Sequence, residues 1–105
     1  MNHPRRPCIM DVTILLGSSS DLPIAEKCTK ILDHFSVTYQ LRVASAHRSP
    51  VFVEEIINQA EADGCQVFIA MAGLAAALPG AVAALTTKPV IGVPCGGRVP
   101  YDSLL

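Results

Sequence analysis

The order of apolar segments along the chain constrains the fold more than any other feature. Short apolar runs of strand length alternate with segments whose apolar residues recur every three or four positions, as on one face of a helix. This β-α-β-α-β-α-β order with short connections is typical of a parallel sheet covered by helices on both faces. We therefore predict an α/β fold with strands at 12–16, 37–43, 66–71 and 89–93, helical stripes over 24–35 and 53–60, and a short helix at about 79–85.

Local signals refine two of these elements. The segment 37–43 alternates apolar and polar residues, which predicts an edge or near-edge strand with one more exposed face. Ser20 or Asp21 is expected to cap the first helix, with Pro23 in its first turn. Pro94 is expected to end the last strand.

Length and charge limit the classes of function. A chain of 105 residues has room for one domain, and we expect residues 1–10 to form a disordered tail. The net charge of −1, without a basic stripe, argues against nucleic acid and membrane surfaces and favours a small soluble metabolite. The uncharged stretch 67–85 reaches the length of a membrane span, but Gly73, Pro79 and Gly80 interrupt it, so we predict a buried strand, a turn and a buried helix.

The four cysteines give no sign of a metal site or a disulfide framework. They show neither CxxC spacing nor histidines at zinc-finger distances, which favours reduced thiols in a cytoplasmic protein. A nucleophilic role for Cys95 would need a lowered pKa, for which the sequence offers only Arg98.

The candidate chemistry lies in the loops that follow the strands, because these loops meet at the carboxyl edge of a parallel sheet. In the loop 17–21, a glycine, three serines and Asp21 precede a helix. Backbone N–H groups, serine hydroxyls and the helix dipole can converge there on a monophosphate, although a plain helix cap has the same composition. Asp21 is suited either to capping or to accepting hydrogen bonds from sugar hydroxyls.

Two further loops are candidates. His47 and Arg48 stand among small residues at the end of a strand, where an imidazole can exchange protons near neutral pH and a guanidinium can clamp a phosphate. A purely structural histidine is the alternative. The loop 72–80 offers backbone approach to a flat ligand and a small apolar pocket, or only tight packing of a helix on the sheet.

Four blocks together resemble the PurE family of N5-carboxyaminoimidazole ribonucleotide mutases, over about Val12 to Leu105: GSSSD at 17–21, SAHRSP at 45–50, LPG at 78–80 and PVIGVP at 89–94. The resemblance implies a flavodoxin-like three-layer αβα domain at 11–105 that lacks the C-terminal part of the family fold. It also implies a homo-octamer, no metal, no cofactor, and a ribonucleotide and CO2 as ligands.

The resemblance also assigns roles to individual residues. Ser18, Ser20 and Arg48 would hold the phosphate, Asp21 would hold the ribose hydroxyls, and His47 would be the general acid and base. Gly73 would lie over the aminoimidazole, and the remaining members of the expected substrate site are Gly17, Ser45 and Leu78.

The activity implied by the resemblance belongs to purine (IMP) biosynthesis. A mutase of this family is an isomerase that moves a carboxyl group from N5 to C4 of the aminoimidazole. Leu74 and Ala77 replace a glycine and a histidine that mutases of the family usually have. The sequence therefore leaves open a lyase-type AIR carboxylase that uses CO2 directly, a relative acting on another ribonucleotide, a non-catalytic module that binds a nucleotide phosphate, and an inactive fragment.

Overall fold

Four parallel strands form a single sheet in the computed structural model, which describes residues 10–44, 50–73 and 77–95. The spatial order of the strands is β2-β1-β3-β4. The strands are β1 (Val12–Leu16), β2 (Tyr39–Val43), β3 (Val67–Ala72) and β4 (Val90–Pro94), and the helices are the 3-10 turn η1 (Ser19–Asp21), α1 (Leu22–His34), α2 (Pro50–Ala62) and α3 (Ala77–Ala83).

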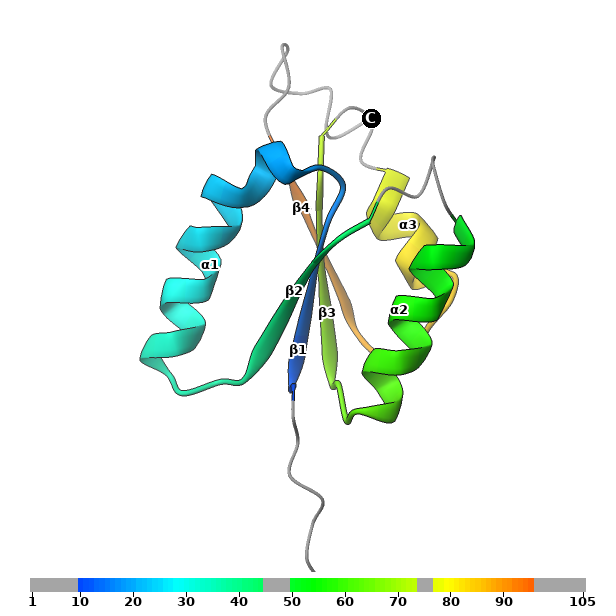
Figure 1. The fold of residues 1–105 in the computed structure, drawn as a ribbon, viewed down its shortest axis with the longest axis horizontal. Coiled ribbons are helices and arrows are strands. Elements are labelled where there is room, and N and C mark those ends of the chain that lie inside the picture. Colours follow the sequence, from blue (N-terminus) through cyan, green and yellow to red (C-terminus); the bar gives the residue numbers. More distant parts are fainter. Residues whose placement is uncertain (1–9, 45–49, 74–76, 96–105) are drawn as a thin grey trace, which may run out of the picture.

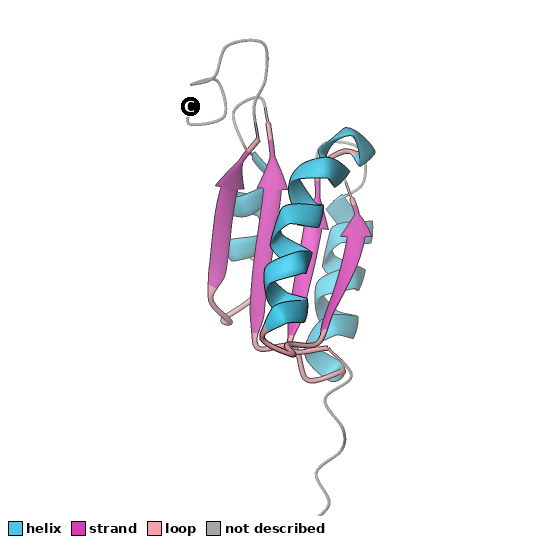
Figure 2. Cartoon of the chain, turned by 90° about the vertical axis from the view of Figure 1, so that its left-hand side faces the viewer, coloured by secondary structure: helices cyan, strands magenta, loops and turns pink. Residues whose placement is uncertain are grey.

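The helices form a layer on each face of the sheet (Figures 1 and 2). The step from β1 to β2 runs in one direction along the sheet, whereas the steps from β2 to β3 and from β3 to β4 run in the other. Because parallel crossovers are right-handed, α1 lies on one face and α2 and α3 lie on the opposite face. The predicted three-layer αβα, flavodoxin-like fold is therefore confirmed.

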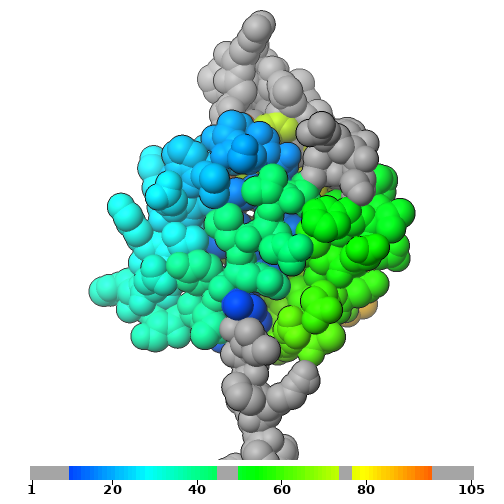
Figure 3. Space-filling model, viewed as in Figure 1, coloured from blue at the N-terminus to red at the C-terminus, as the bar shows by residue number. Residues whose placement is uncertain are grey.

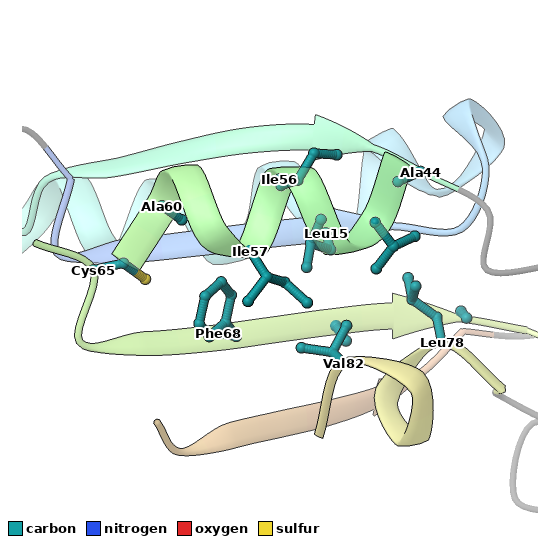
Figure 4. Close-up of a cluster of buried hydrophobic side chains, with 12 residues drawn as sticks. Leu15, Ala44, Ile56, Ile57, Ala60, Cys65, Phe68, Leu78 and Val82 are labelled. Atoms are coloured by element: carbon teal, nitrogen blue, oxygen red, sulfur yellow. The ribbon is translucent and has the colours of Figure 1, made fainter. Parts of the chain in front are cut away.

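The layer between the sheet and the helices α2 and α3 holds the larger apolar cluster (Figure 4). Leu15 and Phe68 project into it from the central strands, and Ile57 and Val82 project from the helices. All four side chains are fully buried. Thr13, the buried polar residue of β1, accepts a hydrogen bond from Gln40 Nε2 at 3.1 Å.

The second layer lies between the sheet and α1. Ile14, Leu16 and Met71 project into it from the strands, and Ala25 is the residue of α1 that is fully buried against them. All five residues of β1 are buried, because β1 is paired on both edges and covered on both faces.

The two edge strands are partly exposed. The prediction of an edge strand at 37–43 is confirmed by β2, whose surface lies between α1 and α2 in Figure 3. At the other edge, Ile91 of β4 is 51% exposed. Pro94 is the last residue of β4 rather than the residue after it, which was expected. A proline is tolerated in an edge strand because its missing N–H can fall on the unpaired side.

Other element boundaries differ slightly from the predicted ones. α3 begins at Ala77, two residues before the expected start, and so contains Pro79 within its first turn, where a proline is tolerated. The uncharged stretch 67–85 forms β3 and α3, as predicted. Among the described residues, no helix combines the length and the hydropathy that crossing a membrane requires.

A set of hydrogen bonds between Asp11, Thr38 and Gln66, named the clasp here, lies at the amino edge of the sheet, where the strands begin. The Asp11 N–H donates to Thr38 O at 3.0 Å and to Thr38 Oγ1 at 2.9 Å, and Thr38 Oγ1 donates to Asp11 Oδ2 at 3.0 Å. The Asp11 carbonyl accepts from the N–H of Gln66 at 2.8 Å. The clasp therefore joins the starts of β1, β2 and β3.

Candidate functional site

The carboxyl ends of β1 and β3 lie side by side, with Leu16 paired to Met71. The connections that leave these two strands run in opposite directions along the sheet. Such a switch point opens a crevice between neighbouring loops and is the usual ligand site of open parallel sheets. The first and third candidate loops begin here, at the carboxyl edge of the sheet at which the sequence predicted them.

Gly17 brings the two strand ends into direct contact. Its N–H donates to Met71 O at 2.9 Å, and a Cβ placed on Gly17 would lie 3.3 Å from Ala72 Cβ. Positive φ angles among the described residues occur at Ser36 and Gly64, so Gly17 is not required for an unusual backbone angle. Glycine fits this position because a side chain would require the neighbouring strand to shift by a few tenths of an ångström.

The serines form a compact polar turn directly after Gly17. Ser18 Oγ accepts a hydrogen bond from the Ser20 N–H at 3.2 Å and lies 2.9 Å from Ser20 Oγ, with which it also shares a hydrogen bond. Both side chains are exposed, and the 13-residue helix α1 begins directly after the turn. Two adjacent hydroxyls at the positive end of a helix dipole suit one anionic group.

Asp21 occupies the N-cap position of α1, but its side chain makes no capping hydrogen bond. The prediction that Ser20 or Asp21 caps this helix is confirmed for the position of Asp21, although the side-chain hydrogen bond that usually accompanies this position is absent. The chain enters α1 through η1, in which the Asp21 N–H already donates to Ser18 O at 3.1 Å and the Leu22 N–H donates to Ser19 O. The Asp21 carboxylate is thus left for partners outside the helix.

Cys95 lies at the same edge of the sheet, directly after β4. Its N–H donates to Ala72 O at 3.0 Å, which fixes it beside the end of β3, and its side chain is 1% exposed. Burial raises the pKa of the Cys95 thiol, and the charge of Asp21 and a hydrogen bond with that carboxylate raise it further. A protonated thiol is a poor nucleophile, so the structure argues against nucleophilic catalysis by Cys95.

The third loop leaves β3 through Gly73, which is half-buried. Leu78, in the first turn of α3, is 3% exposed and belongs to the cluster beneath α2 and α3 (Figure 4). Its side chain is therefore part of the core, and the backbone is what this position can offer a ligand. The expected contacts of Gly73 and Leu78 with substrate remain predictions.

Ser45, His47 and Arg48 lie outside the described residues, as do Leu74 and Arg98. The residue that precedes the second loop, Ala44, donates its N–H to Leu16 O at 2.7 Å. The segment that carries the candidate acid–base residue therefore begins beside the end of β1.

The described part of the chain gives no candidate metal centre. Within residues 10–44, 50–73 and 77–95, no group of three or more His, Cys, Asp and Glu side chains is placed to hold a metal ion. Among the described residues, Cys28, Cys65 and Cys95 form no disulfide with one another.

The effect of Asp21 on the Cys95 thiol, whose pKa the carboxylate raises, was not anticipated from the sequence. Its signal is indirect: both residues end a segment at the carboxyl edge of a parallel sheet. Strand order decides which of those segments meet, and the periodicity of the sequence does not encode that order.

The comparisons with known proteins agree with one another. The family model described as AIR carboxylase matches residues 11–105. The N5-carboxyaminoimidazole ribonucleotide mutase of Methanocaldococcus jannaschii is 57% identical over 95 residues, which cover 90% of this chain and 59% of the relative. The mutase of Pyrococcus abyssi is 49% identical over 96 residues, covering 90% and 55%, and that of Aliivibrio fischeri is 46% identical over 98 residues, covering 91% and 61%.

The solved structures agree with the sequence relatives. The crystal structure of Treponema denticola PurE superimposes with a TM-score of 0.81 at 34% identity, over 90% of this chain and 63% of that chain. This chain therefore spans between 55% and 63% of the length of these four relatives.

Proposed function

The chain belongs to the AIR carboxylase family, and we propose on that premise that it acts as an N5-carboxyaminoimidazole ribonucleotide mutase of purine biosynthesis. Relatives at 46–57% identity carry this name. Because the chain spans only part of their length, the activity is a proposal for this chain. The observation that carries it is the position of the serine turn 18–20 at the switch point of a family fold.

Substrate binding follows from the polar groups at this edge. Ser18 and Ser20, together with the start of α1 and Arg48, hold the 5′-phosphate. Asp21 accepts hydrogen bonds from the ribose hydroxyls, for which its lack of a capping bond leaves it available. The backbone of Gly73 lies over the aminoimidazole, and Gly17, Ser45 and Leu78 complete the site.

The reaction needs positioning and one proton carrier. The bond between N5 and the carboxyl carbon breaks, the electron pair returns to the nitrogen, and CO2 is released. The ring carbon C4 then attacks the CO2, and its proton passes to His47, which returns a proton to the amine. A site walled by small residues such as Ala72 retains CO2 near C4 and excludes water.

The test supplies either N5-carboxyaminoimidazole ribonucleotide, or aminoimidazole ribonucleotide with bicarbonate, and measures the formation of carboxyaminoimidazole ribonucleotide. A mutase is expected to turn over the first substrate and not the second set. His47→Asn should lower kcat by about 100-fold or more, while ribonucleotide binding is retained. The matched control His34→Asn changes an exposed histidine in the last turn of α1 and should leave turnover unchanged. Equal turnover in the two variants would remove the acid–base role.

A second candidate activity is direct carboxylation. It is favoured by Leu74 and Ala77, which depart from the pattern of family mutases. Turnover of aminoimidazole ribonucleotide with bicarbonate, but not of the N5-carboxylated substrate, would identify a carboxylase. Phosphate-dependent binding without turnover of either substrate would identify a binding module, and no ligand-induced stabilisation would identify an inactive fragment.

The family resemblance also supports an assembled, cytoplasmic enzyme built from a domain at 11–105. We propose a homo-octamer that uses no metal and no cofactor. Exposed apolar side chains one turn apart at the end of α1, Ile31 at 60% and the C-cap residue Phe35 at 69% exposure, support burial against another copy. Sedimentation velocity should give the mass of eight chains, and a monomer would refute the assembly.

A further inference from the structure

The strand β4 has one backbone edge that no other described strand covers, because it pairs with β3 alone among the described strands. At one end of this pairing, Pro89 O accepts from the Phe68 N–H at 3.0 Å, and at the other end the Cys95 N–H donates to Ala72 O at 3.0 Å. Backbone groups alternate in direction along a strand. The odd-numbered residues of β4 therefore face β3, and the even-numbered residues face outward.

The outward backbone groups form a short, regular set of donors and acceptors. Val90 and Gly92 each present an N–H and a C=O, and Pro94 presents only a C=O, so that its missing N–H falls on this outer side. Gly92 is exposed, although α3 lies close to it: a Cβ on Gly92 would be 3.1 Å from Pro79 Cβ. The edge is thus open to another strand in the plane of the sheet.

The side chains of β4 add an apolar surface on the face of the sheet that carries α1. Val93 packs against the cluster beneath α1, and Ile91, two residues earlier, projects from the same face. Ile91 is 51% exposed, because α1 lies over the middle of the sheet and leaves β4, the strand at the left of Figure 2, uncovered. A further strand beside β4 would cover the Ile91 side chain.

The distribution of charge favours a second copy of this chain as that further strand. β4 carries no charged side chain, so two identical strands can approach each other without like-charge repulsion. β2, at the other edge of the sheet, carries Arg42, and a charged side chain of this kind protects an edge strand from pairing. Of the two edges, β4 is therefore the one suited to pairing with itself.

The outward groups of β4 are also complementary to themselves. In an antiparallel pair about a two-fold axis at Gly92, the two Gly92 residues would exchange two N–H···O bonds. Each Val90 N–H would then donate to the carbonyl of the partner subunit's Pro94. The missing N–H of proline leaves only one acceptor on each strand without a donor, the Val90 carbonyl.

We propose that β4 pairs with β4 of a second copy in this antiparallel register, so that the two sheets become one continuous sheet. Ile91 then lies opposite the partner subunit's Val93, and its exposed side is buried in the contact. The contact gives the proposed assembly one defined interface and does not depend on the proposed activity.

Cysteine cross-linking tests the register. Chains with Ile91→Cys are mixed with chains with Val93→Cys and left to exchange under mild oxidation. In the proposed pair, residues 91 and 93 of opposite copies have Cα atoms about 4.5 Å apart, within the range of a disulfide. Either chain alone offers only diagonal neighbours, so the mixture should cross-link at least about tenfold faster. The wild type, with its own four cysteines, gives the background rate, and equal rates in all samples would overturn the register.

Amide hydrogen exchange tests the pairing in the unmodified chain. The Gly92 N–H is hydrogen-bonded only in the pair, where its protection factor should be at least about tenfold above that of Leu41. Leu41 is the matched amide of the other edge: it faces outward from β2, because the Ala44 N–H, three residues later, donates inward to Leu16 O. Equal protection of Gly92 and Leu41 at millimolar concentration would overturn the pairing.

A charged variant shows whether protection comes from a second copy. Ile91→Lys places two like charges at the contact, so the protection of Gly92 should be lost. The Val93 N–H faces β3 and should stay protected, which shows that the variant is folded. The control Val51→Lys changes a valine of α2 that is 65% exposed and should leave Gly92 protected.

The remaining outcomes separate this contact from the proposed assembly and activity. Protection of Gly92 that persists in Ile91→Lys, with no cross-link in the mixture, would place another segment of the same chain at the edge and overturn the proposal. An assembly of eight chains without the cross-link would keep the proposed octamer and overturn only this contact. Turnover is measured separately, so its absence would leave the contact standing.

Discussion

Gly17→Ala tests whether the switch point is as tightly packed as the structure indicates. The added Cβ would lie 3.3 Å from Ala72 Cβ, which is closer than ordinary van der Waals contact of 3.4–4 Å. Ala72 cannot retreat easily, because its carbonyl accepts from Cys95 and the neighbouring Met71 carbonyl accepts from Gly17. The two strand ends would therefore have to separate by a few tenths of an ångström.

The expected magnitude follows from opposing effects. Replacing glycine by alanine at an unstrained position gains about 0.4–1 kcal/mol by restricting the unfolded chain, whereas overpacking costs about 1–3 kcal/mol. We expect Gly17→Ala to lower the free energy of unfolding by about 1 kcal/mol and Gly17→Val to lower it by about 2–3 kcal/mol. Either change should also weaken binding at the loop 17–21.

Gly80→Ala is the matched control. A Cβ on Gly80 would meet nothing within 4 Å, and the residue lies within α3, so the change should gain about 0.5–1 kcal/mol. The two substitutions should then differ by about 2 kcal/mol, equivalent to roughly 10 °C in Tm for a domain of this size. Circular dichroism melts and urea midpoints measure both values. A Gly17→Ala protein as stable as Gly80→Ala would refute the close packing of the strand ends.

Three further predictions concern the rest of the fold. Phe68→Ala removes a fully buried ring and should cost about 3–5 kcal/mol in urea unfolding; a cost below that of Gly17→Ala would contradict the core described for β3. Thr38→Val removes both hydrogen bonds between the Thr38 hydroxyl and Asp11 and should cost about 1 kcal/mol per bond lost. The urea midpoint measures this loss, and an unchanged midpoint would mean that these hydrogen bonds do not stabilise the fold. Burial raises the pKa values of Cys28 and Cys95, so the folded state holds these protons more tightly than the unfolded state. The free energy of unfolding should therefore fall as the pH rises above the ordinary thiol value of 9.0. Replacing both thiols by serine should make this dependence on pH shallower, and an identical slope would contradict the raised pKa values.

Most of the fold could be predicted from the periodicity of the sequence, and the errors in the predicted element boundaries have local causes. The strand 12–16 has the predicted bounds because an apolar run ends abruptly at Gly17. β2 begins at Tyr39, two residues later than predicted, because the Val37 N–H donates to Leu32 O at 2.9 Å and Ser36 adopts φ 58°. Residues 37–38, which continue the alternation of the strand in the sequence, therefore belong to the connection that follows α1.

The candidate site was less accessible to prediction than the fold. That the loops share one edge follows from the parallel arrangement of the strands, which the β-α alternation indicated. That Gly17 contacts the end of β3 depends on β1 and β3 being neighbours, which no local pattern specifies. The turn η1 could not be predicted, because a three-residue 3-10 turn has no periodicity. For the same reason the missing capping bond of the Asp21 side chain could not be predicted.

The position of β1 in the sheet has a consequence for how the protein is made. β1 leaves the ribosome before the other three strands, yet its second edge is completed by β3, only after β2 and α2 have been synthesised. Until then its apolar run presents an unpaired edge in the nascent chain, the kind of surface that invites aggregation and chaperone binding.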